Sequence, residues 1–295
     1  MISKANIFYT AIIAIIFSFT ANGQDVYWEL GFGGGVSSYW GDLKSDSFSD
    51  NFRNPNAGGN LFLRYNYERF AGRLMLTVGK ISGSDKDSRN ESLRQRNLDF
   101  FSPITEGALL VEYNIFGLNP KDDEAIFTPH LTLGVGFVKF DPKTTYNGNK
   151  VRLQPLGTEG QTLPGFPEKY KLTEMVIPMG GGLKFKINRN LVGSIELLGR
   201  VTFTDYLDDV STNYAFFDEL LVHNGQLSAN LSQRFDEYLG EGEGSNANLT
   251  NGGKRGGADV NDYYFTFYFN LSYNLGSKLS LGGRSRRGGG SCPRF

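Results

Sequence analysis

Apolar and polar residues alternate strictly along residues 262–275. The odd-numbered positions are apolar and fall on one face of an extended chain: Tyr263, Phe265, Phe267, Phe269, Leu271, Tyr273 and Leu275. A strand that crosses a bilayer within a β-barrel needs ~9–11 residues and one apolar face, because its outside meets lipid while its inside stays polar. A water-soluble sheet shows the same alternation, so this pattern predicts a strand without deciding its surroundings.

Seven other segments show the same alternation and are bounded by turn residues. The sequence therefore predicts eight strands: 26–37, 56–67, 70–82, 101–115, 126–140, 174–188, 191–203 and 262–275.

The links between these strands alternate in length. Tight turns occur at 67–70 and 188–191, and a link of about ten residues surrounds 119–123. The other links are long and polar: 38–55, 83–100, 141–173 and 204–261. An up-and-down barrel sorts such links onto opposite rims, the pattern of outer-membrane barrels with periplasmic turns and long surface loops. We predict an all-β, eight-stranded antiparallel transmembrane barrel over residues 24–275 and weigh a soluble, lipocalin-like barrel as the alternative.

The chain begins with the pattern of an export signal. Lys4 precedes an apolar run at 7–19, and the small residues Ala21 and Gly23 favour cleavage after residue 23. The run is too short for a membrane-spanning helix. Residues 1–23 are predicted to be a cleaved signal, with the mature protein in the outer membrane of a Gram-negative bacterium.

Charged residues are predicted to fill the lumen. Continuing the alternation places acids and bases on the inner face: Glu29, Arg64, Glu68, Arg73, Glu106, Glu112, Lys184, Lys186, Glu196 and Arg200. The interior of an eight-stranded barrel is just wide enough to be filled by side chains, and buried ions must be paired there. We expect a cross-linked polar plug and a closed lumen, with an ion or proton path as the weaker alternative. Glycines at 31–35, 134–136 and 180–182 are expected to permit bending and close backbone approach.

Composition argues against most other functions. The formal net charge of −1 gives no broad field that would favour nucleic acid. His130 is expected near the periplasmic rim and His223 in the last long loop, so the two cannot share a metal or an acid–base site. Asp218 or Glu219 beside His223 forms no recognisable nucleophile motif. We predict no enzyme activity, no cofactor and no small-molecule substrate.

An acidic cluster follows the seventh strand. Asp205, Asp208 and Asp209 could supply two or three oxygen ligands to Ca²⁺, but the Gly-bent loop of a specific calcium site is missing. The favoured interpretation is a solvated strand end whose aspartates cap turns.

Two motifs carry a resemblance to a known family. The segment 39–43, with Gly41, Asp42 and Leu43, and the segment 204–211, with Asp205, Tyr206, Asp208 and Asp209, resemble those of PorG-like outer-membrane proteins. These are eight-stranded barrels of the type IX secretion system, which also drives gliding motility in some bacteria. The resemblance implies a non-enzymatic component that contacts a periplasmic ring of a PorK-like lipoprotein and a PorN-like protein. A small passive pore and an outer-membrane barrel enzyme are the alternatives.

The tail after the last strand suggests a contact to that ring. Residues 276–295 are rich in Gly and Arg and are predicted to be a flexible periplasmic segment, with both chain termini on that side. Cys292 is the only cysteine, and three arginines near it favour its thiolate: Arg286, Arg287 and Arg294. The two interpretations left open are an intermolecular disulfide to the ring lipoprotein and an unbonded thiol.

Overall fold

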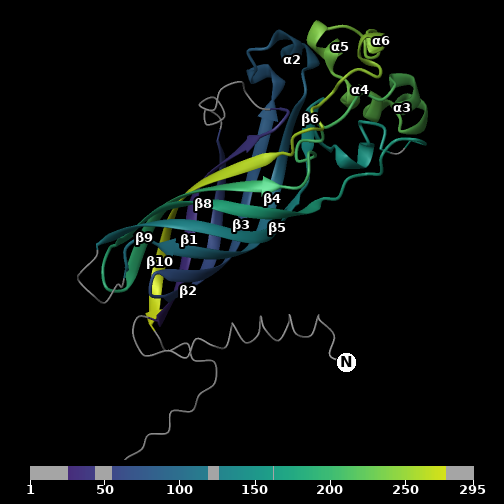
Figure 1. Ribbon diagram of the computed structural model, residues 1–295. Coiled ribbons are helices and arrows are strands. Elements are labelled where there is room, and N and C mark those ends of the chain that lie inside the picture. Colours follow the sequence, from purple (N-terminus) through teal and green to yellow (C-terminus); the bar gives the residue numbers. More distant parts are fainter. Residues whose placement is uncertain (1–25, 44–54, 119–125, 162, 277–295) are drawn as a thin grey trace, which may run out of the picture.

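Eight long antiparallel strands form a closed barrel (Figure 1). The computed structural model describes residues 26–43, 55–118, 126–161 and 163–276. The barrel strands are β1 (Val26–Trp40), β2 (Asn56–Tyr67), β3 (Phe70–Ser84), β4 (Asp99–Asn114), β5 (Phe127–Phe140), β8 (Thr173–Lys186), β9 (Leu191–Thr202) and β10 (Tyr263–Gly276). Each pairs with the next long strand along the chain, and β1 pairs with β10 to close the ring. The predicted fold is confirmed. The largest difference in strand ends is at β1, which continues to Trp40 instead of stopping at residue 37.

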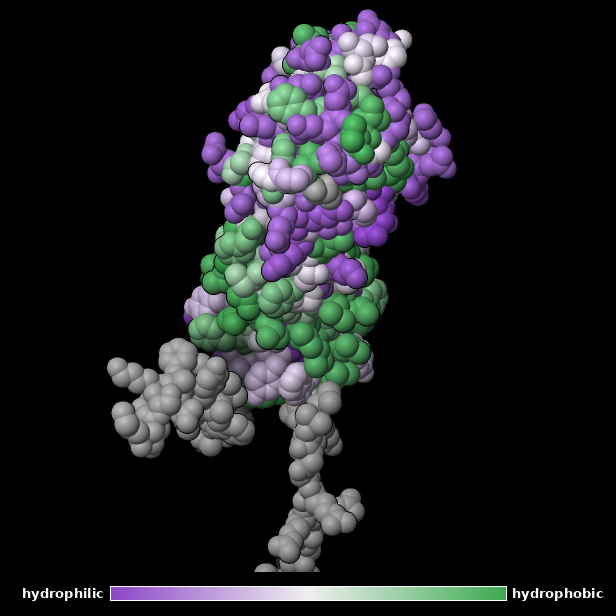
Figure 2. Space-filling model, turned by 90° about the vertical axis from the view of Figure 1, so that its right-hand side faces the viewer, coloured by the Kyte–Doolittle hydropathy of each residue, from purple (hydrophilic) through white to green (hydrophobic). Residues whose placement is uncertain are grey.

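Hydrophobic side chains cover the outside of the barrel. Phe32, Leu76, Leu133 and Phe137 are 58–63% exposed. Figure 2 shows a hydrophobic band around the barrel on the face in view. Soluble proteins rarely expose a contiguous apolar surface of this extent, whereas lipid covers it in a membrane. The soluble lipocalin-like alternative is therefore wrong, because such a barrel would bury these side chains inside.

Aromatic pairs mark the rim that carries the short turns. The ring centroids of Trp28 and Tyr65 are 4.9 Å apart, and those of Phe70 and Tyr113 are 5.1 Å apart. Such girdles lie at the level of the lipid headgroups in membrane barrels. The β2–β3 turn contains Glu68, which has a φ of 50° and an exposed side chain. Its predicted place in the lumen is wrong, because the strand ends one residue earlier at Tyr67.

The long links fold into a compact cap at the opposite rim (Figure 1). Their elements are the 3-10 helices η2 (Asp85–Asp87) and η3 (Gln154–Leu156), the hairpin of β6 (Lys143–Tyr146) and β7 (Asn149–Arg152), and the helices α2 (Glu91–Arg96), α3 (Phe217–His223), α4 (Gln226–Ser232), α5 (Phe235–Leu239) and α6 (Ala247–Thr250). The alternation of apolar and polar residues, which predicted the strands, did not predict these short elements. Among the described residues, no helix combines the length and apolar character needed to cross a membrane.

Two hydrophobic cores hold the cap. The larger core runs from the barrel mouth into the cap, because Phe100 and Phe140 of the strands pack with Leu207, Val210 and Leu231 of the last long link. The smaller core lies within the cap around Phe217 and Leu220 of α3. The barrel mouth is therefore closed by packed side chains rather than by mobile polar loops.

Glycines on the inner face of β1 make room for large side chains. A Cβ at Gly31 would lie 2.3 Å from the Phe62 ring, and one at Gly33 would lie 1.9 Å from the Asn270 side chain. Real Cβ atoms do not approach other atoms so closely, so these positions require glycine. The expected close approach is found, and it allows Phe62 to enter the lumen.

Candidate functional site

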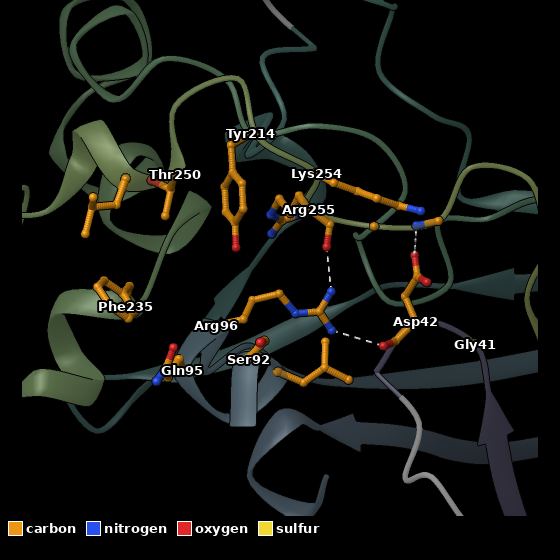
Figure 3. Close-up of a pocket in the computed structure, with 14 residues that line it drawn as sticks. Gly41, Asp42, Ser92, Gln95, Arg96, Tyr214, Phe235, Thr250, Lys254 and Arg255 are labelled. Carbon is orange, nitrogen blue, oxygen red and sulfur yellow. Dashed lines mark hydrogen bonds between the residues drawn. The ribbon is translucent and has the colours of Figure 1, made fainter. Parts of the chain in front are cut away.

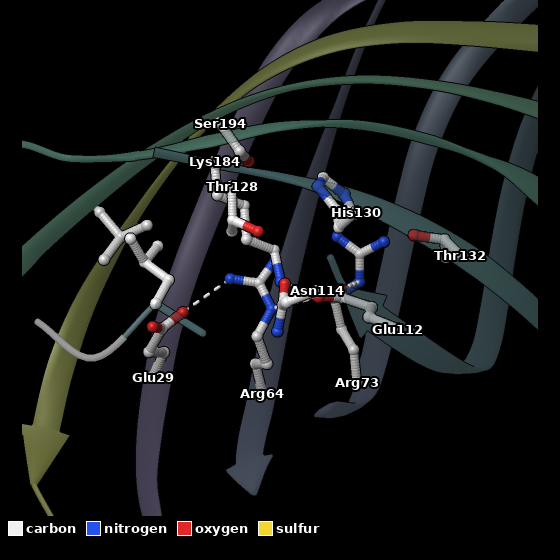
Figure 4. Close-up of polar contacts among 12 residues, drawn as sticks. Glu29, Arg64, Arg73, Glu112, Asn114, Thr128, His130, Thr132, Lys184 and Ser194 are labelled. Atoms are coloured by element: carbon white, nitrogen blue, oxygen red, sulfur yellow. Dashed lines mark hydrogen bonds and ion pairs between the residues drawn. The ribbon is translucent and has the colours of Figure 1, made fainter. Parts of the chain in front are cut away.

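The half of the lumen nearer the short turns holds a network of paired charges (Figure 4). Glu112 lies at its centre and binds Nε of Arg64 at 3.0 Å, Nε of Arg73 at 2.8 Å, and the Lys184 ammonium. Arg64 also binds Glu29 at 2.6 Å, and Arg73 binds Glu196 at 2.6 Å. All six residues are at most 2% exposed. Because every strong charge faces an opposite one, the network links β1, β2, β3, β4, β8 and β9 across the barrel interior.

His130 joins this network. Its Nε2 lies 3.3 Å from Oε1 of Glu196, and the imidazole is buried in the lumen. It is close to the start of β5, as expected, but its contact with the charge network was not predicted. Its even-numbered position, shared with the inward-facing Thr128 and Thr132, was the sequence signal that could have placed it there. His223 ends α3 in the cap and is exposed, so the two histidines are apart as expected.

An apolar layer divides the lumen above that network. Phe62, Met75, Ala108, Leu110 and Leu198 form a buried cluster from four strands. The guanidinium carbons of Arg64 and Arg73 lie 4.7 and 5.4 Å from the centroid of the Phe62 ring, so the charges stack directly against this layer. The predicted cross-linked charges are present, and this apolar layer between them was not predicted.

A second charge pair lies on the cap side of that layer. Nε of Arg200 donates to Oε2 of Glu106 at 3.0 Å, and the Tyr264 hydroxyl donates to the same oxygen at 2.6 Å. Arg200 therefore belongs to a separate pair and not to the network of Glu112. Lys186, also predicted for the lumen, is the last residue of β8 and is half-buried.

The two motifs that carry the family resemblance meet at the barrel mouth. The Tyr39 hydroxyl lies 2.6 Å from Oδ2 of Asp208 and 2.6 Å from Oδ1 of Asp262. A phenol has one proton to donate, so it satisfies one carboxylate and accepts from the other in its protonated form. Burial raises the pKa of Asp208 and of Asp262 well above the ordinary range, and the charge of Asp262 raises that of Asp208 further. The phenol therefore lies between two carboxyls whose raised pKa values favour protonation of one of them.

Asp209 connects the same motif to the link between β5 and β8. Its carboxylate accepts hydrogen bonds of 2.6 Å from Thr158 and from Tyr170, and its backbone has a φ of 70°. Burial raises the pKa of Asp209 to about 6, although Arg255 opposes this shift. The Tyr170 ring stacks on that of Tyr206 with centroids 4.6 Å apart.

A buried ion pair fixes the third long link to the end of the fourth. Arg255 donates to Glu159 at 3.0 Å, and Glu159 accepts from the Ser211 backbone at 2.9 Å. Asp205 precedes Ser211 by six residues and is 8% exposed. Burial raises the pKa of Asp205 to about 7. The interpretation of Asp205, Asp208 and Asp209 as a solvated strand end is therefore wrong, because the cap covers them.

Asp42 of the first long link and Arg96 of the second bind each other and the end of the fourth long link (Figure 3). The Arg96 guanidinium binds both carboxylate oxygens of Asp85 at 2.7 Å and donates to the backbone oxygens of Asp42, at 3.0 Å, and Arg255. The Gly257 amide donates to the Asp42 carboxylate at 2.7 Å. Beside these contacts an open pocket of about 580 Å³ is lined by Tyr214, Phe235, Lys254 and others. Gly41 lines this pocket, and Leu43 is buried in the larger core.

Sequence reasoning missed most of the partners that hold this junction. Glu159, Tyr170, Arg96 and Arg255 lie in long links without periodicity, so no local signal places them near the motifs. Within the described residues, no group of His, Cys, Asp and Glu side chains has the arrangement of a metal site. The predicted signal at 1–23 and the tail with Arg286, Arg287, Cys292 and Arg294 lie outside the described residues.

Comparison with known families gives a match over most of the chain. Residues 6–238 match a family described as a domain of unknown function, DUF6089. The chain belongs to this family. No protein with a curated description matches the chain.

Solved structures of small barrels are similar at low identity. Ail, the attachment invasion locus protein of Yersinia pestis, solved in complex with the heparin analogue sucrose octasulfate, has a TM-score of 0.39 and 11% identity, covering 85% of this chain and 100% of its own. Neisserial surface protein A has a TM-score of 0.40 and 6% identity, covering 85% and 99%. The N-terminal β-barrel domain of Pseudomonas aeruginosa OprF has a TM-score of 0.34 and 8% identity, covering 85% and 100%.

Proposed function

We propose that this DUF6089 protein is a non-enzymatic barrel of the outer membrane that acts as a rigid scaffold in a type IX secretion machine. The observation that carries the scaffold role is the filled interior: two sets of paired charges separated by an apolar layer, with a packed cap above. Moving water or solute through it would require breaking buried ion pairs, which costs several kcal/mol for each pair.

The secretion role rests on the resemblance at segments 39–43 and 204–211. The contact between Tyr39 and Asp208 gives these motifs a common structural purpose, the attachment of the cap to the barrel mouth. In the proposed orientation the short turns and both termini lie in the periplasm and the cap faces the outside of the cell, following the usual arrangement of bacterial barrels.

The proposed partners are a PorK-like ring lipoprotein and a PorN-like protein on the periplasmic side. The contact would use the tail, with Cys292 forming an intermolecular disulfide and Arg286, Arg287 and Arg294 providing charge. Non-reducing gels of whole cells test the disulfide, because a higher-mass band should disappear both under reduction and in a Cys292→Ser strain. A band that persists in both conditions would contradict the covalent link.

Electrical recording separates the scaffold from the passive pore. The purified barrel in planar bilayers should give no steady conductance, while a porin of similar preparation serves as the positive control. Steady openings of the wild-type barrel would contradict the closed scaffold. Co-purification of the tagged protein from outer membranes, with partner identification, and secretion measured in a deletion strain test the type IX role. Normal secretion without the protein would contradict that role.

A further inference from the structure

Basic side chains lie directly above the apolar band on one side of the barrel. Lys80 follows the outward-facing Val78 by two residues on β3, and Lys139 follows the outward-facing Phe137 by two residues on β5. Val78 and Phe137 are about 60% exposed and belong to the lipid-facing band. The next outward position toward the cap is thus a lysine on both strands. Figure 2 shows hydrophilic side chains immediately above the hydrophobic band.

The β6–β7 hairpin extends this basic surface. Phe101 of β4 pairs with Lys143 of β6, and Lys143 pairs with Arg152 of β7. The ammonium groups of Lys80 and Lys150 lie 5.6 and 5.7 Å from the centroid of the Phe101 ring. One aromatic ring therefore lies within cation–π distance of two cations from different elements.

Most of this charge is not neutralised by the protein. Asp141 binds Lys143 at 3.1 Å and Arg152 at 2.8 Å. Lys80, Lys139 and Lys150 are exposed and form no ion pair with a described residue. By contrast, no outward-facing residue of β1, β2, β9 or β10 is Lys or Arg, so the cations are confined to one side of the described barrel.

We propose that Lys80, Lys139 and Lys150 bind the phosphate groups of lipids in the membrane leaflet on the cap side. The position of these lysines indicates the ligand, because a cation at the edge of a lipid-facing band lies at the depth of the lipid headgroups. Ammonium groups form charge-assisted hydrogen bonds with phosphate oxygens, and Phe101 offers an apolar surface at the same level. The inference rests on the proposed orientation, with the cap outside the cell, where the lipid carrying these phosphates is lipopolysaccharide.

Binding of lipopolysaccharide to the detergent-folded barrel tests this inference. The variant Lys80→Gln/Lys139→Gln/Lys150→Gln should bind lipopolysaccharide more weakly than wild type, by about 5-fold for each lysine removed. Wild type should also lose this affinity for dephosphorylated lipopolysaccharide and at high salt. The control is Lys254→Gln, which removes an exposed lysine beside the pocket of Tyr214 and Phe235 and should bind like wild type.

Several results would overturn the inference. They are equal binding by the triple variant, equal loss in the control variant, binding confined to phosphatidylglycerol, or full displacement of the lipid by inorganic phosphate. A heat-modifiable gel shift verifies that each variant is folded. Because the assay uses purified barrel, its outcome is independent of secretion. A barrel that binds lipopolysaccharide but is dispensable for secretion would refute the type IX role alone.

Discussion

Buried side chains connect the cap to the barrel, and Tyr39 offers the clearest test of these contacts. Its hydroxyl joins Asp208 of the last long link to Asp262 at the start of β10. Tyr39→Phe removes the donor and leaves two buried carboxyls without their shared partner. We expect a loss of about 1–3 kcal/mol in the free energy of unfolding, measured by urea titration of the folded barrel. Tyr273→Phe is the control, because Tyr273 is on the outer face of β10 and 50% exposed. Equal stability of both variants would refute the role of the Tyr39 hydroxyl.

The pair of Arg200 and Glu106 tests whether the lumen is dry. Arg200→Met leaves Glu106 buried with only Tyr264 as a partner, so the barrel should lose about 3–5 kcal/mol of stability. Replacing both residues, as Arg200→Met/Glu106→Gln, should recover much of this loss because no unpaired charge remains. The unfolding temperature in the heat-modifiable gel shift is the measurement. An Arg200→Met barrel as stable as wild type would mean that water or another group solvates Glu106.

Glu196→Gln should also destabilise the barrel, because Arg73 then loses the carboxylate that it binds at 2.6 Å.

At the scale of elements, the last long link makes the cap sensitive to pH. The pKa of Asp205 is raised to about 7 and that of Asp209 to about 6, against ~3.9 in an unfolded chain. Between these values the folded cap binds more protons than the unfolded chain. This stabilisation is complete below about pH 4 and is lost as the pH rises through 6 to 7.

Urea unfolding at pH 5.5 and at pH 8.0 measures this effect. The wild-type midpoint should fall at the higher pH, and Asp205→Asn should reduce the difference because a neutral amide replaces the titrating group. Glu219→Gln, at an exposed position of the same link, should behave like wild type. A midpoint that rises from pH 5.5 to 8.0 in wild type, or an Asp205→Asn profile identical to wild type, would contradict the assignment.

At the scale of the whole molecule, barrel and cap differ in what holds them. The barrel has a complete hydrogen-bonded ring and its own lumen network, whereas the cap depends on the barrel mouth for half of its larger core. Replacing residues 205–261 with a short turn should therefore leave a barrel that still folds. Its unfolding temperature should be lower, because Phe100 and Phe140 lose the cover of Leu207, Val210 and Leu231. A gel shift that disappears entirely would show that the barrel needs the cap to form.

The sequence by itself determined the barrel. Side chains alternate with a period of two along a strand, so a buried inner face and a lipid-facing outer face leave a direct imprint on the residue order. The same alternation correctly predicts an inward direction for eight charged side chains: Glu29, Arg64, Arg73, Glu106, Glu112, Lys184, Glu196 and Arg200. It fails at Glu68, where a turn follows the end of the strand.

Only the tertiary structure decided how these residues pair and what the long links do. Strand register and barrel shear decide which carboxylate meets which guanidinium. The sequences of β4 and β9 therefore do not reveal that the apolar layer around Phe62 separates Arg200 from Glu112. The cap elements are too short for periodicity to reveal them. The contacts of Glu159 with Arg255 and of Tyr39 with Asp208 span 96 and 169 residues. Burial of Asp205, Asp208 and Asp209 follows from those long-range contacts, because the acidity of a segment does not tell whether another segment will cover it.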